Sequence, residues 1–235
     1  MTGSGKTTVR REKKHPVQKA GFFITFEGGE GAGKSTQIKH LAAYLRTRGF
    51  PVVITREPGG TPGAEAIRHV LLSGHVQEEG ALMEAVLFAA ARADHVETLI
   101  APALARGEIV LCDRFIDSTR VYQGAVGEIP QSYIRLLEYV TVDKWMPDLT
   151  FILDIPARLG MERANARRAA TEAVDRFEQD SINIQEERRQ AFLKIARKEP
   201  ERCCIIDATQ PMEAIAAEIA QISDEKIKGE ADSGI

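Results

Sequence analysis

Two stretches of the chain place glycine and lysine directly before a hydroxyl residue, which is the core of a phosphate-binding loop. Residues 28–36 read GGEGAGKST, and residues 3–8 read GSGKTT. The first stretch has the full spacing, in which a glycine and four further residues precede Gly33, Lys34 and Ser35. The second lacks the leading glycine and a preceding apolar segment, so we interpret it as a chance match in a disordered tail.

The residue types in this phosphate loop, residues 28–36, suit the triphosphate of a nucleotide. Glycines allow successive backbone N–H groups to converge on an anion, and the N-terminus of the following helix adds its dipole. Lys34 would reach the β- and γ-phosphates, and the hydroxyl of Ser35 would bind Mg²⁺. A glycine-rich turn that binds nothing is the alternative. The predicted nucleotide contacts are Gly28, Gly29, Glu30, Gly31, Ala32, Gly33, Lys34, Ser35 and Thr36.

Charged residues near the ends of other apolar segments predict a metal ligand and a second anion site. Asp113 ends the run IVLCD, where its carboxylate could bind Mg²⁺ directly or through water, or could instead cap a helix. Arg56, Arg92 and Arg114 also lie near segment ends, and a guanidinium matches the geometry of a phosphate. Three such arginines indicate a second anion site beside the phosphate loop, which a nucleoside monophosphate would fit.

Short apolar segments alternate with longer segments of helical periodicity. The apolar segments are rich in β-branched and aromatic residues, and they predict strands at 22–27, 51–55, 108–112, 149–155 and 203–207. Helices are predicted from Lys34 to a stop at Gly49 and at 81–105, 130–145, 157–168, 178–198 and 211–222. This alternation predicts an α/β fold of the P-loop NTPase type, with a doubly wound five-stranded parallel sheet and helices on both faces.

Length and composition limit the remaining possibilities. The 235 residues suit one domain, predicted at 21–222, between a basic tail at 1–20 and a polar tail at 223–235 that we expect to fray. The net charge of −3 supplies no basic field for nucleic acid, and no apolar run is long enough to span a bilayer. Three cysteines without a CxxC pattern are interpreted as buried and reduced, which favours a cytoplasmic protein.

The chain resembles the thymidylate kinase family, whose P-loop enzymes phosphorylate dTMP. The resemblance extends from Phe22 to Ile222, and its most specific segment is DRFIDSTRVYQG, residues 113–124. The other matching segments are FEGGEGAGKST, TREPGGT, LFAAAR, PDLTFILDI, DRFEQ and IDATQP. The resemblance implies a homodimeric cytoplasmic enzyme that uses ATP and Mg²⁺ to convert dTMP to dTDP.

The resemblance implies contacts with the phosphate and the sugar of dTMP. Arg114 would grip the acceptor phosphate, with Arg56 assisting. Glu30, inside the phosphate loop, would contact the 3′-hydroxyl of the sugar. Tyr122 would pack where a ribose 2′-hydroxyl would lie, and it would therefore favour a deoxynucleotide. The phosphate loop would thus contact both the phosphate donor and the phosphate acceptor.

The resemblance also implies four contacts with thymine. Phe88 would stack on the base, and Arg92 would hydrogen-bond its edge. Thr119 and Gln123 would read its polar edge, because a mismatched base leaves buried polar groups unpaired. Considered alone, Phe88 is more typical of a core position on an alanine-rich helix. Arg92 follows one helical turn later on the same face, and this favours the base-binding interpretation.

An arginine-bearing lid is predicted at residues 163–178, which read RANARRAATEAVDRFE. In isolation, such arginines are typical of a solvated basic face. The phosphate loop contains no arginine, so the chain resembles the class of the family in which lid arginines contact the transferred phosphate. The predicted catalytic residues are Lys34, Arg114 and Arg167. Unlike many relatives, this lid has no glycine after its arginines, which leaves the choice among the lid arginines open.

Two other functions remain compatible with the motifs. The nearer one is another nucleoside monophosphate kinase or a deoxynucleoside kinase, which a panel of acceptors would distinguish. The more distant one is a nucleotide-dependent switch or an assembly ATPase. A GTPase switch typically carries an Asn-Lys-x-Asp sequence for guanine, which is absent here, since residues 142–144 read VDK.

Overall fold

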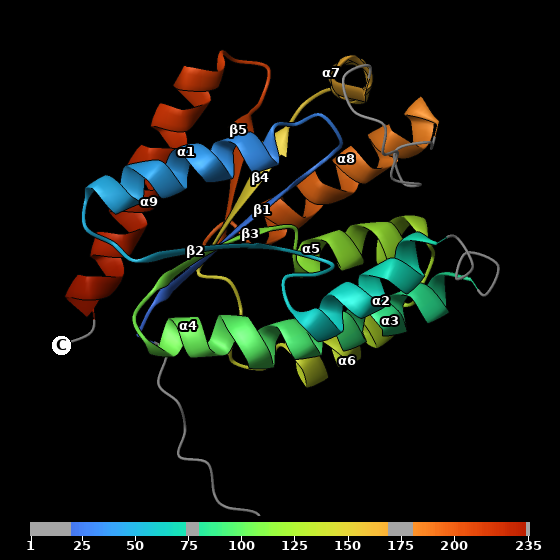
Figure 1. Ribbon diagram of the computed structural model, residues 1–235. Helices are drawn as coiled ribbons and strands as arrows, with labels where there is room; N and C mark the ends of the chain where they lie inside the picture. Colours follow the sequence, from blue (N-terminus) through green and yellow to red (C-terminus); the bar gives the residue numbers. More distant parts are fainter. Residues whose placement is uncertain (1–19, 74–79, 169–180, 234–235) are drawn as a thin grey trace, which may run out of the picture.

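The structure, a computed structural model, describes residues 20–73, 80–168 and 181–233, without the side chains of 167, 168 and 230–233. Five strands form one sheet: β1 (Phe22–Gly28), β2 (Val52–Arg56), β3 (Ile109–Asp113), β4 (Leu149–Asp154) and β5 (Cys203–Asp207). Their order is β2-β3-β1-β4-β5, and all neighbours are parallel (Figure 1). The predicted sheet is confirmed, and each strand lies within one residue of its predicted bounds.

Helical segments connect and cover the strands. They are α1 (Lys34–Thr47), α2 (Pro62–Leu72), α3 (Ala81–His95), η2 (Val96–Ile100), α4 (Ala101–Ala105), α5 (Ile116–Thr119), η3 (Arg120–Val126), α6 (Gln131–Thr141), α7 (Ala157–Arg168), α8 (Ile182–Lys198) and α9 (Met212–Ser233). Of these, η2 and η3 are π-helical. The predicted alternation of strands and helices is therefore present.

Alternate residues of the central strand β1 face opposite sides of the sheet. Phe22, Ile24 and Phe26 pack with apolar residues of α1 and α9. Phe23 packs on the opposite side, against η2, α4 and the segment that follows α6. Helices therefore cover both faces of the sheet (Figure 1). Burying a side chain such as that of Phe26 stabilises the fold by about 1.5–3 kcal/mol.

Residues 81–105, predicted as one helix, form a continuous helical run that contains a wider turn. α3 passes through η2 into α4, and the junction residues Val96 and Ala101 keep helical φ and ψ angles. Pro102 has no N–H, and in a regular α-helix its ring would clash with the carbonyl group of Thr98. The π-helical geometry of η2 widens the run at this point and accommodates the proline.

Among the described residues, three helical segments lie in stretches for which no helix is predicted: α2, α5 and η3. α2 has a local signal, because Thr61 is its N-cap, the Thr61 hydroxyl accepts from the N–H of Ala64, and Pro62 is the first helical residue. α5 and η3 have no capping side chain of their own. A carboxylate from β1 caps α5 instead, and such a long-range contact leaves no local sequence signal.

The predicted end of the helix at 130–145 is wrong. α6 ends at Thr141, and Asp143 has a left-handed φ of 48°, which breaks the helical path. Val142 and Trp145 then turn into the core between the sheet and α4. Their burial outweighs the weak helical preference of these residues.

The predicted end of the last helix at 222 is also wrong, because α9 continues to Ser233 instead of fraying from Ser223. Ser223 is fully buried, and its hydroxyl donates to the carbonyl oxygen of Ile219 at 2.7 Å. Ile227 packs against the core on the α1 side of the sheet. Tyr44 of α1 adds a hydrogen bond to Asp224 at 2.8 Å. These contacts hold the polar end of the helix on the protein.

Two findings bear on membranes and on the redox state. Across the described ranges, none of the helices combines the length and the apolar character that a membrane span requires. The three cysteines are free, with Cys112 and Cys203 buried and Cys204 partly buried. The predicted burial is therefore confirmed for Cys112 and Cys203 but not for Cys204.

Candidate active site

The predicted phosphate loop lies between β1 and α1, as a strand–loop–helix motif requires. Gly28 has a φ of 130°, and Gly31 has a φ of 69°. A Cβ atom at Gly31 would lie 2.0 Å from the carbonyl oxygen of Gly160, and one at Gly28 would lie 2.5 Å from that of Leu153. Glycine is therefore required at both positions. α1 begins directly after Gly33, so its first N–H groups have no helical partner and can bind an anion.

Lys34 is buried at the start of α1, and its side chain turns back over the loop. Its Nζ donates to the carbonyl oxygens of Gly28 at 3.0 Å and Gly29 at 2.9 Å. Burial, and after it repulsion from Arg114, lowers the pKa of the ammonium group. A phosphate bound in the loop would offset both costs, because an opposite charge favours the charged form of the lysine.

Ser35 and Asp113, the two predicted magnesium ligands, are in direct contact. The Ser35 hydroxyl donates to Oδ2 of Asp113 at 2.5 Å. The parallel pairing of β1 and β3 places Asp113 opposite Phe26, and so brings the end of β3 beside the phosphate loop. Two such oxygens fit Mg²⁺, which also takes phosphate oxygens and water as ligands. No cluster of three or more His, Cys, Asp or Glu side chains suited to a metal occurs within the described part of the chain.

Arg114 lies in the turn after β3 and faces the phosphate loop. Its guanidinium pairs with the carboxylate of Glu30, and its Nη1 lies 3.3 Å from the hydroxyl of Ser118 and 3.4 Å from the carbonyl oxygen of Gly28. Its backbone has a left-handed φ of 66°, which is uncommon outside glycine and costs on the order of 1–3 kcal/mol. Neighbouring groups must therefore impose this conformation on the turn.

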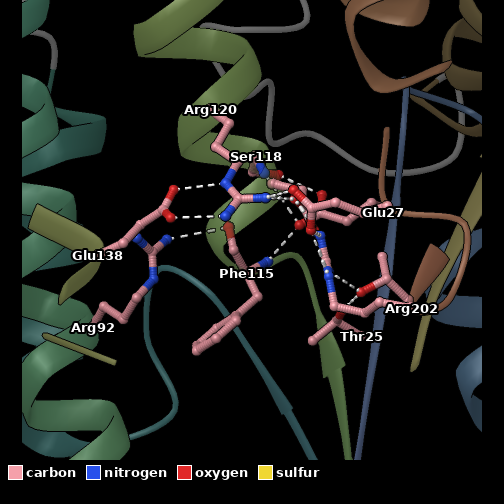
Figure 2. A network of polar contacts seen from close by, with 11 residues as sticks. Thr25, Glu27, Arg92, Phe115, Ser118, Arg120, Glu138 and Arg202 are labelled. Atoms are coloured by element: carbon pink, nitrogen blue, oxygen red, sulfur yellow. Dashed lines mark hydrogen bonds and ion pairs between the residues drawn. The ribbon is translucent and has the colours of Figure 1, made fainter. Parts of the chain in front are cut away.

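Arg92 projects from α3 and is only 2% exposed. Its Nε donates to Oε2 of Glu57 at 2.8 Å, and its Nη2 donates to the carbonyl oxygen of Phe115 at 3.1 Å and to the hydroxyl of Thr119 at 3.0 Å. Figure 2 shows Arg92 directed at Phe115. Oε1 of Glu57 lies 3.1 Å from Nδ1 of His95. This buried network fixes one predicted base-reading residue, Arg92, against another, Thr119.

One cavity of about 220 Å³ brings the predicted residues together. All those predicted to bind the substrate line it: Glu30, Arg56, Phe88, Arg92, Arg114, Thr119, Tyr122 and Gln123. The phosphate loop contributes Gly31, Gly33, Lys34, Ser35 and Thr36, and Asp113 lies on the same wall. Gly28, Gly29 and Ala32 belong to the loop but do not line the cavity. The individual roles of these residues stay predictions.

Three of the predicted substrate-binding residues, Gln123, Phe88 and Arg56, differ in how far they are exposed to solvent. Gln123 is buried, and its Nε2 donates to Oε2 of Glu84 at 3.2 Å. Phe88 is half-buried on α3. Arg56 is exposed at the end of β2, where it pairs with Glu65 at 2.8 Å. The end of the cavity at Gln123 is therefore more enclosed than the end at which Arg56 lies.

Several polar residues of the site are missing from the predicted set. Arg68 and Ser118 line the cavity, and Glu57 anchors Arg92. The guanidinium of Arg188, on α8, lies 4.4 Å from the ring centre of Tyr122. Two of them have a signal in the sequence, because Glu57 lies within the family segment TREPGGT and Ser118 within DRFIDSTRVYQG. The contacts of the others depend on how distant elements pack.

The lid prediction is only partly covered by the structure. Arg163 donates from Nη1 to the carbonyl oxygen of Ala208 at 2.8 Å, which ties α7 to the segment after β5. For Arg167 and Arg168 the structure describes the backbone but not the side chains. Residues 169–178 of the predicted lid lie outside the described residues. The same holds for GSGKTT at residues 3–8.

Comparisons with known proteins show the family of the chain. The family model described as "Thymidylate kinase" matches residues 26–219. The thymidylate kinase of Bartonella quintana is 60% identical over 208 residues, which cover 88% of this chain and 97% of that protein. The thymidylate kinase of Bartonella henselae is 56% identical over 207 residues, covering 88% and 96%.

A solved structure is similar as well. The crystal structure of thymidylate kinase from Ehrlichia chaffeensis superposes with a TM-score of 0.68 at 35% sequence identity. The match covers 86% of this chain and 98% of that one. Sequence and fold therefore agree over most of the chain, and the chain belongs to the thymidylate kinase family.

Proposed function

We propose that this chain transfers the γ-phosphoryl group of ATP to the phosphate of dTMP and releases dTDP and ADP. Its membership of the thymidylate kinase family supports this function. The observation that carries the proposal is the single cavity in which Lys34 and the phosphate loop adjoin Arg114 and the predicted base contacts. A donor phosphate at the loop and an acceptor phosphate at Arg114 would lie next to each other, as direct transfer requires.

The acceptor would lie with its phosphate at Arg114 and its base toward α3. Phe88 would supply stacking area, which adds affinity without selecting a base. Arg92, Thr119 and Gln123 would select thymine through hydrogen bonds in an enclosed site. Arg92 is already held by Glu57 and by the backbone, so it loses little freedom when it binds the base.

The transfer needs no covalent intermediate on the protein. A phosphate oxygen of dTMP attacks the γ-phosphorus in line, the bond to the β–γ bridging oxygen breaks, and its electron pair leaves with ADP. Lys34 and Arg114 would neutralise the charge that spreads over the transferring group. Ser35 and Asp113 would hold Mg²⁺, which supplies further charge neutralisation at the phosphates when it is bound.

A third cationic contact would come from the lid. Arg167 is our choice, because the phosphate loop lacks an arginine and the resemblance implies the lid-arginine class. Arg163 is less suited, since its guanidinium already bonds to Ala208. Closure of the lid would exclude water and so limit hydrolysis of ATP without transfer.

We further propose a homodimer that forms through α3 and α6, which pack against each other. Both helices also expose apolar side chains: Leu82, Met83 and Val86 on α3, and Tyr133, Leu136, Tyr139 and Val140 on α6. Apolar surface of this extent is typical of protein interfaces. A second copy of the chain is the occupant that the resemblance implies. A cytoplasmic location completes the proposal and agrees with three free thiols.

Transfer of label from [γ-³²P]ATP to dTMP tests this function. The purified chain should produce labelled dTDP only when both dTMP and Mg²⁺ are present. Lys34→Ala should lower the rate by about 100-fold or more, because the charge on the transferring phosphoryl group is no longer neutralised by a positioned cation. Release of labelled inorganic phosphate at a rate independent of dTMP would instead favour a P-loop ATPase.

A further inference from the structure

Glu27 is a fully buried carboxylate at the end of β1, and the mechanism above gives it no role. The alternation of β1 directs its side chain to the same side of the sheet as Phe23 and Thr25, away from α1. Its Oε1 accepts from the backbone N–H of Phe115 at 2.7 Å and of Ser118 at 3.1 Å. Its Oε2 accepts from the hydroxyl of Ser118 at 2.7 Å (Figure 2).

These three hydrogen bonds hold the turn that carries Arg114. Phe115 directly follows Arg114, and Ser118 lies in the first turn of α5, so one carboxylate fixes both groups. The N–H of Arg114 itself donates to the carbonyl oxygen of Phe26 at 2.9 Å. β1 therefore holds the turn on both sides of Arg114, whose left-handed φ requires such support.

Glu27 also reaches the guanidinium of Arg114 through one intervening hydroxyl. The Ser118 hydroxyl donates its hydrogen to Glu27, so its lone pairs are free to accept from Nη1 of Arg114 at 3.3 Å. Ser118 and Phe115 line the cavity, whereas Glu27 does not. The carboxylate thus lies beneath the wall of the cavity and orients groups that form the wall.

We propose that Glu27 is a positioning residue, which holds the turn after β3 so that Arg114 presents its guanidinium to the acceptor phosphate. The inference rests on the proposed function, because it assigns Arg114 to the phosphate of dTMP. It predicts that Glu27 contributes through the geometry of its hydrogen bonds rather than through its charge.

The environment of Glu27 supports a geometric contribution. Burial, and after it repulsion from Asp117, raises the pKa of Glu27 to about 7, while Arg114 and the bonds from Ser118 and Phe115 oppose the rise. A neutral glutamine has the same shape, accepts through its carbonyl oxygen, and can donate from its amide to the Ser118 oxygen. An aspartate keeps the charge but is one methylene shorter, so it cannot reach both N–H groups from the same backbone position.

Two substitutions at this position separate shape from charge. Glu27→Gln should keep kcat/KM for dTMP within about fivefold of the wild type, a change of about 1 kcal/mol. Glu27→Asp should lower kcat/KM for dTMP by about 100-fold through misplacement of Arg114. The equilibrium Kd of ATP, measured without acceptor, should change by less than about twofold in both variants. The reason is that neither substitution alters the residues of the phosphate loop that bind ATP.

Thr25→Val is the matched control. Thr25 is equally buried on the same side of β1, and its hydroxyl contacts Thr150 at 2.7 Å instead of the Arg114 turn. This variant should lose stability, as judged by thermal denaturation, without a specific rise in KM for dTMP. The same kinetic loss in Thr25→Val as in Glu27→Asp would overturn the proposal. An active Glu27→Asp beside an inactive Glu27→Gln would also overturn it, by showing that the charge contributes.

Ser118→Ala keeps the test decisive if Glu27→Asp does not fold. It removes the hydroxyl between Glu27 and Arg114, and KM for dTMP should rise about tenfold with the Kd of ATP unchanged. A normal KM in a folded Ser118→Ala protein would contradict the proposal. Failure of the wild type to phosphorylate dTMP would instead contradict the proposed function, so the two failures are distinguishable.

Discussion

The guanidinium of Arg114, in the turn after β3, pairs with the carboxylate of Glu30, in the phosphate loop. Both side chains are mostly buried, with exposed fractions of 19% and 15%. They are predicted to bind the phosphate and the 3′-hydroxyl of the same acceptor. An acceptor phosphate that binds Arg114 therefore competes with Glu30 for the guanidinium. We expect this competition to free the Glu30 carboxylate for the sugar.

Glu30→Ala should raise KM for dTMP by about tenfold or more, because a charge-assisted hydrogen bond contributes about 1.5–3 kcal/mol. The Kd of ATP should stay near that of the wild type, which equilibrium binding without acceptor would measure. Glu108→Ala is the control, since Glu108 also pairs with an arginine but lies away from the cavity. Equal losses of dTMP use and ATP binding would show that Glu30 maintains the shape of the loop.

Asp113→Asn should raise the Mg²⁺ concentration required for half-maximal activity by about 10- to 100-fold, because it removes a charged metal contact. The measurement is the initial rate against Mg²⁺ at saturating ATP and dTMP. Asp207→Asn provides a matched control, since Asp207 ends the parallel strand β5 and its carboxylate accepts hydrogen bonds from Thr209 instead of lying at the phosphate loop. An unchanged Mg²⁺ requirement in Asp113→Asn would remove Asp113 from the proposed metal site.

Leu136→Glu should convert the proposed homodimer into a monomer, because it places a charge in the apolar surface of α3 and α6. Leu136 is 60% exposed in the single chain. Sedimentation velocity at micromolar concentration would measure the change. Ile182→Glu, at a similarly exposed position on α8, should leave the dimer intact. A wild-type protein that sediments as a monomer would contradict the proposed assembly.

The raised pKa of Glu27 predicts a specific pH dependence of stability. Because burial raises this pKa from 4.5 to about 7, the folded state binds the proton more tightly than the unfolded state. The free energy of unfolding should therefore decrease as pH rises between these values. The titratable groups that interact electrostatically with Glu27 are Asp117, Arg114, Lys34, Tyr122 and Cys112.

Glu27→Gln removes this titration and leaves the surrounding groups in place. Its melting temperature should fall less than that of the wild type between pH 5 and pH 8, by several degrees, since about 1 kcal/mol corresponds to about 2–4 °C in a protein of this size. Thermal denaturation of both proteins across this range is the measurement. Parallel curves would show that Glu27 has the same pKa in both states.

The phosphate loop and β1 can be predicted from the sequence because their signals are local. The motif spacing and the apolar run lie within residues 22–36, and the structure places a strand, a loop and a helix there. The role of Glu27 cannot be predicted in this way. Its partner Phe115 is 88 residues away, so the contact depends on β1 and β3 becoming neighbours in the sheet.

The candidate site likewise contains residues that the sequence predicts and residues that depend on long-range packing. Arg92 and Phe88 are one helical turn apart, so the sequence predicts that they share a face. Glu57, which orients Arg92, comes from the segment after β2, and only the packing of α3 against that segment brings them together. Residues that touch the substrate are thus easier to predict than the residues that position them.

Selectivity among acceptors tests the central claim most directly. Initial rates should be measured with ATP and Mg²⁺ and with dTMP, dUMP, dCMP, dGMP, AMP and thymidine in turn. The account predicts that kcat/KM is highest for dTMP and that thymidine, which lacks the phosphate for Arg114, is not phosphorylated. Turnover of dCMP or thymidine with dTMP inert would contradict it.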